Sequence, residues 1–300
     1  MNILVTLNEA YVEPLWVMLS SLFEHEKEFL NIYLMYFSVS QDSLKNLTNF
    51  IEKNGRGKLT CVPVADEMFQ NLPVTDLFPK EVYYRVLCGM ILPETLERIL
   101  YLDSDILIHG SFASFYHMEF GGNILIGITD ATPPGWKLFE RSQKHKERLG
   151  LSPEDVYVNS GVLLIDLMEM RKQFVLKDFC QQVEKIRDDL EWPDQDAINV
   201  YFRGKIGVVD EVYNYPTWFD IPGYWKWYTG EVWKAAPRII HYRGISKPWH
   251  IDYMGKYYFE YRRYARKLQN RRERLLFELK HVLAYIQVLA KLFVLHGREK

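Results

Sequence analysis

The sequence predicts an α/β fold in which helices flank a mixed, mainly parallel sheet, followed by a helical tail. Residues 2–64 alternate apolar strand-like runs with amphipathic helical segments, which is typical of parallel βαβ units. A later apolar run, residues 99–102, ends abruptly in the carboxylates Asp103 and Asp105. With 300 residues and 48% hydrophobic content, the chain can bury the core that such a sheet needs.

The N-terminal part is expected to form a β-α-β-α-β unit followed by a third helix. The expected strands are residues 2–7, 31–39 and 58–64, and the expected helices are residues 14–25, 41–53 and 81–92. Parallel strands joined by right-handed crossovers place ligands beyond their carboxyl ends. Asp103 and Asp105 would therefore lie at the ligand-binding edge of the sheet.

The middle of the chain is expected to add two strands and two helices. The strands are residues 123–129, ending at Asp130, and 162–166, and the helices are residues 174–190 and 194–202. The polar stretch 131–157 is too long for a plain connection, so it forms either a mobile flap or a solvated surface excursion. Aromatic residues crowd positions 213–233, where they either fill the core or form loop platforms for sugar rings.

The chain is expected to divide into a domain of residues 1–255 and a basic amphipathic helical tail of residues 256–300. The tail holds 12 Lys and Arg against 4 Asp and Glu, although the whole chain has a net charge of −2. Its apolar residues fall on one helical stripe: Leu275, Leu276, Leu279, Val282, Leu283, Ile286, Leu289 and Phe293. The stripe could pack on the body, pair two chains in a homodimer, or bind a membrane surface, and the basic first half of the tail favours the membrane.

Composition favours a cytoplasmic protein that does not bind nucleic acid. The body outside the tail is acidic, unlike the surfaces of nucleic-acid binders. Cys61, Cys88 and Cys180 lie far apart, so they indicate neither a disulfide framework nor a thiolate metal site. The N-terminus lacks the pattern of a signal peptide, and no uncharged stretch is long enough to span a bilayer. A lipid-binding tail would hold the protein at the inner face of the plasma membrane.

The Asp103 and Asp105 pair predicts a cation site. Side chains alternate along a strand, so the two carboxylates would share one side while Ser104 points away. Adjacent carboxylates repel each other, and a hard divalent cation such as Mg²⁺ or Mn²⁺ relieves that repulsion. A metal held there could bind a diphosphate. The alternative is that the pair merely closes the strand in a solvated turn.

Four motifs, taken in order, resemble those of glycosyltransferase family 8, especially bacterial lipooligosaccharide galactosyltransferases. They are Leu102-Asp-Ser-Asp105, Asn159-Ser-Gly-Val-Leu-Leu-Ile-Asp166, Asp194-Gln-Asp196 and His241-Tyr-Arg-Gly-Ile-Ser-Lys-Pro-Trp249. The resemblance extends from the N-terminal strand to about Trp249. It implies the GT-A fold, a Rossmann-like fold of nucleotide-diphospho-sugar transferases, and a retaining hexosyltransferase with a UDP-sugar donor.

The resemblance also implies a set of metal-binding and donor-binding residues. Asp103, Asp105 and His241 would bind Mn²⁺, with Mg²⁺ as the alternative ion. The donor-binding residues would be Asn8, Tyr11, Arg85, Asp103, Ser104, Asn159, Ser160, Gly244 and Lys247. Gly244 would let the backbone approach the diphosphate, and Lys247 would stabilise the departing nucleotide. Outside this context His241 would be a structural histidine, Lys247 a surface lysine and Arg85 the partner of a nearby Asp.

The same resemblance implies that Asp130, Asp194 and Gln195 are catalytic and, with Asn159, surround the transferred sugar. Retention normally calls for a carboxylate nucleophile near the anomeric carbon. The family places the Gln195 amide there instead, and an amide oxygen is a poor nucleophile. We therefore expect front-face attack by the acceptor, with the leaving phosphate as base and Gln195 stabilising the oxocarbenium-like centre. Asp194 is the alternative nucleophile, or else only the N-cap of its helix.

One motif departs from the family pattern. Members commonly carry Asp-x-Asn-Tyr after the first strand, whereas this chain has Asn8-Glu-Ala-Tyr11. Tyr11 can still stack on uracil and Asn8 can still accept its N3–H, but the Ala10 side chain makes no polar contact. Losing one neutral hydrogen bond costs about 0.5–1.5 kcal/mol, so UDP is expected to bind up to about tenfold more weakly.

The leading hypothesis is transfer of galactose or glucose from UDP to a hydroxyl of a cell-surface glycan or a lipid-linked acceptor. A phosphohydrolase with an Asp nucleophile is a second enzymatic class, but it predicts a small residue and Thr where this chain has Ile106-Leu107. A third class is a non-catalytic GT-A-like domain that serves as a sugar-nucleotide binder or as a partner subunit, which only Asn8 and Ala10 favour.

Overall fold

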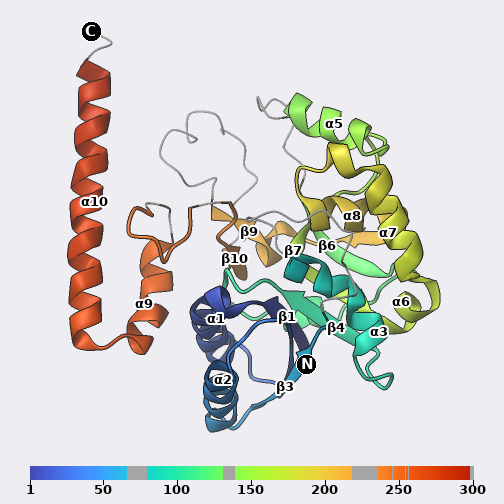
Figure 1. Ribbon diagram of the computed structural model, residues 1–300, viewed down its shortest axis with the longest axis horizontal. Coiled ribbons are helices and arrows are strands. Elements are labelled where there is room, and N and C mark those ends of the chain that lie inside the picture. The colour runs from blue at the N-terminus through green and yellow to red at the C-terminus, as the bar shows by residue number, and fades with distance from the viewer. Residues whose placement is uncertain are drawn as a thin grey trace.

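The computed structural model describes residues 1–65, 80–130, 139–217, 236–244, 246–253, 255 and 257–297, without the side chains of residues 80, 139, 285 and 288–297. Within these residues the chain forms a seven-stranded sheet, in the order β3-β2-β1-β4-β7-β6-β8, and a three-stranded sheet, in the order β5-β10-β9. Helices lie on both faces of the larger sheet (Figure 1).

The first half of the larger sheet is parallel, and its elements follow the predicted order. They are β1 Asn2–Leu7, η1 Glu9–Tyr11, α1 Val12–His25, β2 Leu30–Tyr36, α2 Gln41–Lys53 and β3 Gly57–Pro63. β1 pairs in parallel with both β2 and β4. Alternate residues of β1 face opposite cores: Ile3 and Val5 pack with α1 and α2, whereas Leu4 packs with the helices on the other face.

The remaining elements build the second half of the sheet and its cover. In order they are η3 Lys80–Leu87, α3 Cys88–Ile91, β4 Arg98–Leu102, β5 Ile106–Ile108, α4 Ala113–Tyr116, β6 Leu125–Thr129, α5 Phe139–Arg148, β7 Val158–Asp166, α6 Leu167–Gln173, α7 Leu176–Lys185, η4 Arg187–Asp189, α8 Pro193–Tyr201, β8 Ile206–Val208, η5 Glu211–Tyr213, β9 Tyr215–Pro216, β10 Ile239–His241, α9 Tyr258–Leu268 and α10 Arg271–Gly297. β7 runs antiparallel to β4 and β6, so the sheet is mixed and mainly parallel, as predicted.

Several predicted elements differ in extent or type. The helix expected over residues 174–190 is α7 followed by the short η4, and the strand expected over residues 31–39 ends at Tyr36. β7 begins at Val158, four residues before the predicted strand, because Asn159 and Ser160 are buried polar residues whose side chains are satisfied by other side chains. The predicted helix over residues 81–92 is instead a 3₁₀ segment, η3, followed by the single turn of α3. Apolar spacing alone does not separate these two helix types.

The polar stretch 131–157 is only partly described, and the described part mixes exposed residues with a few buried ones. Residues 139–148 form α5, in which His145 and Lys146 are buried. Lys146 Nζ donates to the carbonyls of Pro153 and Asp155 at 2.7 Å each. Residues 131–138 and most of the aromatic stretch, 218–235, lie outside the described residues, so the predicted flap and sugar platforms there stay predictions.

The tail is helical, as predicted, and its two helices differ in their contacts. α9 packs on the body through Tyr258, Tyr261 and Tyr264, in one cluster with Val17 of α1 and Leu107 of β5. α10 runs along the side of the molecule next to α9 (Figure 1). Among the described residues, no helix combines the length and the apolar character needed to cross a membrane.

Candidate active site

The centre of the candidate site is the turn that joins β4 to β5. Asp103 and Asp105 lie in this turn, not on a strand, so the predicted alternation of side chains is not what brings them together. β5 pairs antiparallel with β10, and His241 lies opposite Ile106 in that register. The pairing therefore carries a histidine 136 positions away in sequence to the side of Asp105.

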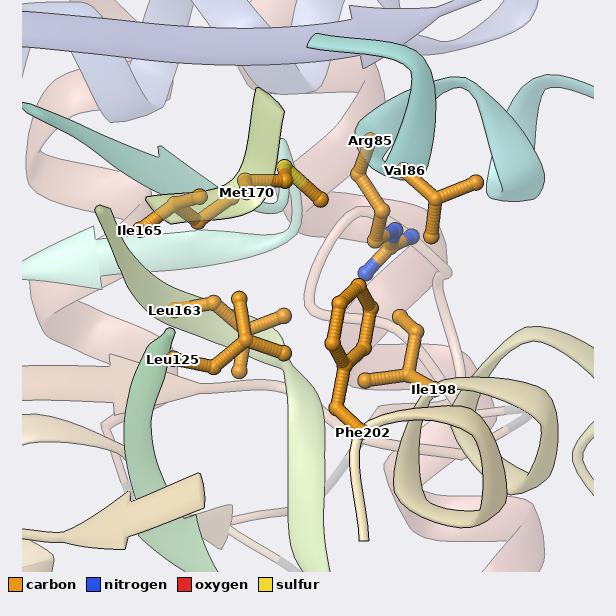
Figure 2. A pocket seen from close by; sticks show the side chains of 8 residues that line it. All are labelled: Arg85, Val86, Leu125, Leu163, Ile165, Met170, Ile198 and Phe202. Carbon is orange, nitrogen blue, oxygen red and sulfur yellow. The ribbon is translucent and has the colours of Figure 1, made fainter. Parts of the chain in front are cut away.

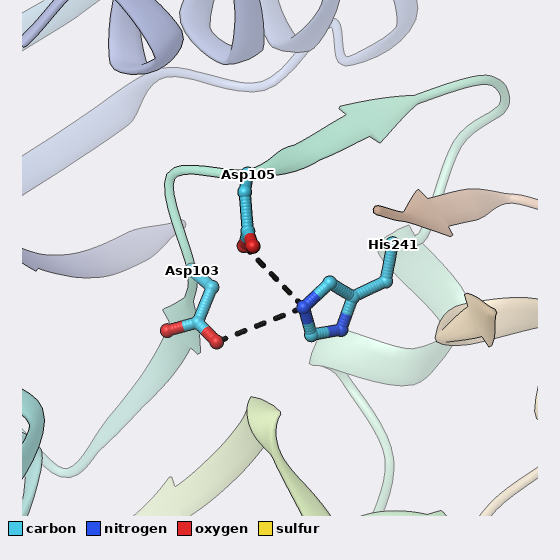
Figure 3. Close-up of side chains that lie close together, drawn as sticks. All are labelled: Asp103, Asp105 and His241. Atoms are coloured by element: carbon cyan, nitrogen blue, oxygen red, sulfur yellow. Dashed lines mark ion pairs between the residues drawn. The ribbon is translucent and has the colours of Figure 1, made fainter. Parts of the chain in front are cut away.

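Asp103, Asp105 and His241 form a compact group that could hold a metal ion. One ligand atom from each lies within 4.8 Å of the others. His241 Nε2 is 3.3 Å from Asp105 Oδ1 and 3.8 Å from Asp103 Oδ2 (Figure 3). Two carboxylates and an imidazole are the oxygen and nitrogen ligands that suit Mn²⁺ or Mg²⁺.

Gly161 of β7 gives this group the space it needs. A Cβ at position 161 would lie 2.3 Å from His241 Cε1 and 2.6 Å from Asp103 Oδ2, distances that no side chain tolerates. The Gly161 carbonyl also accepts the Asp103 backbone N–H at 2.8 Å. The glycine in the Asn159-Ser-Gly motif is thus required by close approach of the strand to the candidate metal ligands.

Lys247 is the cationic residue that pairs with Asp105 of this candidate metal group. Its ammonium lies 2.5 Å from Asp105 Oδ2 and donates to the Tyr242 carbonyl at 2.8 Å. Burial acts to raise the pKa of Asp105, but Lys247 and His241 outweigh it and hold that pKa well below its ordinary value. Burial acts to lower the pKa of Lys247, and the Asp105 carboxylate reverses this and raises it. Asp105 is therefore ionised and Lys247 charged.

Arg85 lies behind the site and is almost fully buried. Its guanidinium is 3.2 Å from Asp103 Oδ1 and 3.5 Å from Asp194 Oδ2, and it donates to the Ser160 carbonyl at 2.5 Å. It also covers the Tyr101 ring at 4.1 Å from the ring centroid. The ion pair that the sequence left as the alternative role for Arg85 is therefore present, and it links the candidate metal group to Asp194.

The side chains behind Arg85 pack tightly. Figure 2 shows the guanidinium at one end of an otherwise apolar cluster, Val86, Leu125, Leu163, Ile165, Met170, Ile198 and Phe202. The space between them does not admit a water molecule. This cluster holds Arg85 in place and is not a substrate pocket.

The predicted catalytic residues meet in a buried hydrogen-bonded group at the start of α8. Gln195 Oε1 accepts from Asn159 Nδ2 at 2.7 Å and from the Ser160 backbone N–H at 3.2 Å. Gln195 Nε2 donates to Asp130 Oδ2 at 2.9 Å and to the Tyr157 hydroxyl at 3.1 Å. Both ends of the amide are therefore held by partners.

Asp194 and Asp130 each have a cationic partner. Asp194 Oδ2 accepts the Ser160 hydroxyl at 2.8 Å beside Arg85, and burial raises the pKa of this carboxyl above its ordinary value. Arg243 Nη1 donates to Asp130 Oδ1 at 2.5 Å. The N-cap role that the sequence left open for Asp194 is not adopted, since Trp192 is the N-cap of α8 and Asp194 lies inside the helix.

The residues predicted to bind the nucleotide lie where β1 ends and around the turn after β10. Asn8 Oδ1 accepts the Ala10 backbone N–H at 3.1 Å and so caps η1. Tyr11 contacts Trp249 edge to face, at 6.0 Å between ring centroids. Burial raises the pKa of Tyr11, and the charges of Lys247 and Asp105 also act on it, which indicates that Tyr11 lies near the metal group.

Two other predicted donor residues lie in turns. Ser104 is buried between Asp103 and Asp105. Gly244 has a φ of +83°, in the left-handed region, and a Cβ there would meet no atom within 4 Å. The glycine is therefore needed for the conformation of the turn that leads to Lys247, rather than for space.

Three further residues of the site were not predicted from the sequence. Tyr157 donates to Asp196 Oδ1 at 2.5 Å, Arg243 bonds Asp130, and Asn214 Oδ1 accepts His241 Nδ1–H at 2.8 Å. Arg243 lies inside the His241 motif, and Tyr157 lies two residues before Asn159. Their closeness to these motifs in the sequence could have marked both as site residues. Asn214 follows the aromatic Tyr213 with no motif around it.

Comparison with known proteins identifies the family. The sequence matches the family described as glycosyl transferase family 8 over residues 2–252. The chain belongs to glycosyltransferase family 8. Proteins similar to the chain include a lipopolysaccharide 1,2-glucosyltransferase of Escherichia coli K12, 25% identical over 255 residues, which are 83% of this chain and 73% of the relative. A lipopolysaccharide 1,3-galactosyltransferase of Salmonella typhimurium is 24% identical over 61% of this chain and 53% of its own length.

Solved structures confirm the predicted GT-A fold of this family 8 enzyme. The galactosyltransferase LgtC, in a complex with donor and acceptor sugar analogues, superposes with a TM-score of 0.77 over 90% of this chain and 97% of its own, at 22% identity. The glycosyltransferase GlyE of Streptococcus pneumoniae superposes with a TM-score of 0.66 over 96% of this chain and 64% of its own, at 19% identity. The match to glycosyltransferase family 8, and not the fold alone, excludes the phosphohydrolase hypothesis.

Proposed function

We propose that the chain is a retaining hexosyltransferase that uses a UDP-sugar and requires Mn²⁺ or Mg²⁺. The observation that carries the proposal is the convergence of Asp103, Asp105 and His241, with Lys247, beside the buried group around Gln195. A divalent cation bound by the first three would neutralise negative charge on the departing nucleoside diphosphate. Lys247, ionised and adjacent, would add a second positive charge to the leaving group.

Front-face attack is the mechanism that the contacts of Gln195 support. Both lone pairs of its amide oxygen are engaged, by Asn159 and by the Ser160 N–H, so the oxygen is a poor nucleophile. Asp194 is engaged by Ser160 and Arg85, which lowers its nucleophilicity as well. We therefore assign attack to the acceptor hydroxyl, proton uptake to the leaving phosphate, and electrostatic support of the oxocarbenium-like centre to Gln195 and Asp130.

The donor sugar is proposed to be glucose or galactose, and the acceptor a cell-surface glycan or a lipid-linked saccharide made at the cytoplasmic face of the membrane. The relatives named above are lipopolysaccharide glucosyl- and galactosyltransferases, which supports both parts of the proposal. Asp130, Asn159 and Gln195 offer carboxylate and amide groups that can hydrogen-bond sugar hydroxyls. Residues 1–255 would carry this activity, and residues 256–300 the membrane contact.

Proton NMR tests the proposed reaction directly. Purified protein with Mn²⁺ is incubated with UDP-glucose or UDP-galactose and saccharide acceptors, and the new anomeric signal is followed. Retention predicts that the initial product has the α configuration of the donor. A β product would contradict the retaining mechanism. UDP binding without turnover on any acceptor would favour the non-catalytic sugar-nucleotide binder.

Restoring the family residue at position 10 is expected to tighten nucleotide binding. Ala10 is exposed in η1, next to Tyr11, so Ala10→Asn adds an amide without disturbing a packed residue. One added neutral hydrogen bond predicts up to about tenfold tighter UDP binding. Calorimetry measures the change, with Ala113→Asn, at a half-buried position of α4 outside the site, as a control for the substitution. Equal affinity of Ala10→Asn and the parent would count against a uracil or ribose contact at this position.

The tail is proposed to bind an anionic membrane surface through the outer face of α10. The body-facing side of α10 is partly polar: Glu278 pairs with Arg262 and Arg266, and His281 stacks on Tyr258 at 4.2 Å. The opposite side carries six apolar residues, each 51–63% exposed: Leu275, Leu276, Leu279, Val282, Leu283 and Ile286. The packing of this stripe on the body, one alternative from the sequence, does not occur for these six.

Charge favours a lipid surface over a second copy of the chain. Arg271 and Arg272 are exposed at the start of α10, so two tails would repel each other whereas anionic lipid headgroups would attract both. Sedimentation with phosphatidylglycerol vesicles is expected to capture the protein, and less so with rising salt. Leu279→Gln with Leu283→Gln should weaken capture at least about tenfold, because each buried Leu contributes about 1.5–3 kcal/mol.

Met168→Gln, which changes an exposed apolar residue of α6, is the control for that experiment and should leave capture unchanged. Equal capture of parent and double variant would contradict the membrane proposal. A dimer in solution that the double variant abolishes would assign the face to a second copy instead.

A further inference from the structure

A continuous line of side-chain amides joins the candidate metal ligand His241 to the carboxylate of Asp130. The successive distances are 2.8 Å from His241 Nδ1 to Asn214 Oδ1, 2.9 Å from Asn214 Nδ2 to Asn159 Oδ1, 2.7 Å from Asn159 Nδ2 to Gln195 Oε1, and 2.9 Å from Gln195 Nε2 to Asp130 Oδ2. All three amides are buried, and Asn214 is fully so. Water therefore does not compete for these bonds.

The direction of this line is fixed by groups that can only donate or only accept. The backbone N–H of Ser160 donates to Gln195 Oε1 at 3.2 Å, and that of Gly161 donates to Asn159 Oδ1 at 3.1 Å. A backbone N–H cannot accept, so both of these amide atoms are oxygens. The Asp130 side chain, paired with Arg243, accepts at the far end, which requires the amino group of Gln195 to face it.

The orientation of Asn214 and the tautomer of His241 follow from this. Because Asn159 presents its oxygen, Asn214 must present its amino group there and its own oxygen to the imidazole. An oxygen accepts, so Nδ1 of His241 carries a hydrogen. In the neutral imidazole Nε2 is then the unprotonated nitrogen, and it faces Asp105 Oδ1 at 3.3 Å. A lone pair facing a carboxylate is unfavourable unless a cation lies between them.

We propose that Asn214 is a positioning residue that holds His241 as the Nδ1–H tautomer and thereby sets the affinity of the site for a divalent cation. The inference rests on the metal site proposed above and adds a residue outside its ligand set. A partner on the second ring nitrogen fixes the plane of the ligand and raises its basicity. Removing such a partner weakens metal binding by about 10–100-fold.

Two substitutions separate positioning from simple packing. Asn214→Ala removes the acceptor, so Mn²⁺ affinity, measured by electron paramagnetic resonance without nucleotide, should fall about 10–100-fold. Asn214→Asp cannot donate to Asn159 but still accepts the Nδ1–H, so it should keep the affinity of the parent or exceed it. The backbone carbonyl of Asn214, which accepts Arg243 Nη2 at 3.0 Å, is present in both variants.

Asn199→Ala is the matched control, because Asn199 is equally buried but bonds only the backbone of Val158 and Gln195. It should lower the melting temperature and leave Mn²⁺ affinity unchanged. Unchanged Mn²⁺ binding in Asn214→Ala, or equal losses in the Ala and Asp variants, would overturn the proposal. A parent that binds no divalent cation would overturn the metal site itself, and this inference with it.

A measurement on the parent protein tests the tautomer of His241 directly, so the result does not depend on whether a variant folds. In protein saturated with diamagnetic Mg²⁺ and containing ¹⁵N-labelled histidine, two-bond ¹⁵N–¹H correlations show which ring nitrogen of His241 carries the hydrogen. The His241 signal is assigned by its absence in His241→Gln. A hydrogen on Nδ1 is the expected result, and a hydrogen on Nε2 would overturn the proposal even if Mn²⁺ binds.

Discussion

Asp105→Asn is expected to reduce hexosyl transfer by at least about 10³-fold, because metal-ion assistance to a departing diphosphate contributes several kcal/mol and each 1.36 kcal/mol is tenfold in rate. Asp105 faces both His241 Nε2 and Lys247 Nζ, so its charge serves the metal and the leaving-group lysine together. Steady-state transfer from the UDP-sugar at saturating Mn²⁺ measures the loss.

Asp155→Asn is the control for that loss. Asp155 also pairs with an arginine, Arg203, but lies in the loop after α5, away from the metal group. It should keep the transfer rate of the parent. Melting curves of both variants show whether the protein stays folded. Asp105→Asn is expected to stay folded, because its side-chain amide still offers Lys247 an acceptor oxygen. A folded Asp105→Asn protein that transfers hexose at the parental rate would contradict metal-assisted departure.

Gln195→Ala should reduce kcat by about 10²–10³-fold with little change in UDP affinity, the size of loss seen when one preorganised polar group is removed from a transition state. The amide belongs to the sugar side of the site, where it bonds Asp130 and Asn159, and not to the predicted nucleotide contacts near Tyr11. Single-turnover rates and UDP calorimetry on the same preparation separate the two effects.

Gln173→Ala removes an exposed glutamine at the end of α6 and should leave both quantities unchanged. Weakened UDP binding in Gln195→Ala, with an unchanged single-turnover rate, would assign Gln195 to donor binding and leave the chemistry to Asp194. An unchanged single-turnover rate in Gln195→Ala would make Asp194→Asn the next variant to test for a nucleophile.

The order of elements and the two aspartates of the metal group could be predicted because both depend on local signals. Apolar periodicity specified β1 to β3 and the two helices between them, and the Asp103 motif marks the end of β4. Periodicity did not indicate that β5 pairs with β10, yet this pairing is what brings His241 to Asp105. The resemblance supplied that contact where the pattern of the chain could not.

Most of the features that the sequence did not predict depend on polar contacts between residues far apart in the chain. The sequence predicted either a mobile flap or a solvated excursion over residues 131–157, and it did not indicate that His145 Nε2 bonds the buried Asp196 at 2.7 Å and thereby joins α5 to α8. Asn214 has no local signal at all, since its role depends on two partners, Asn159 and His241, that are distant in sequence. Short elements such as α4 and β8 are also missed because three or four residues carry too little periodicity.

Calorimetric titration of UDP with and without Mn²⁺ tests the central claim most directly. The account predicts UDP binding that requires Mn²⁺ in the parent and is lost in Asp105→Asn. Binding of UDP that is independent of metal and of Asp105, or no binding at all, would contradict the donor site formed by Asp103, Asp105, His241 and Lys247.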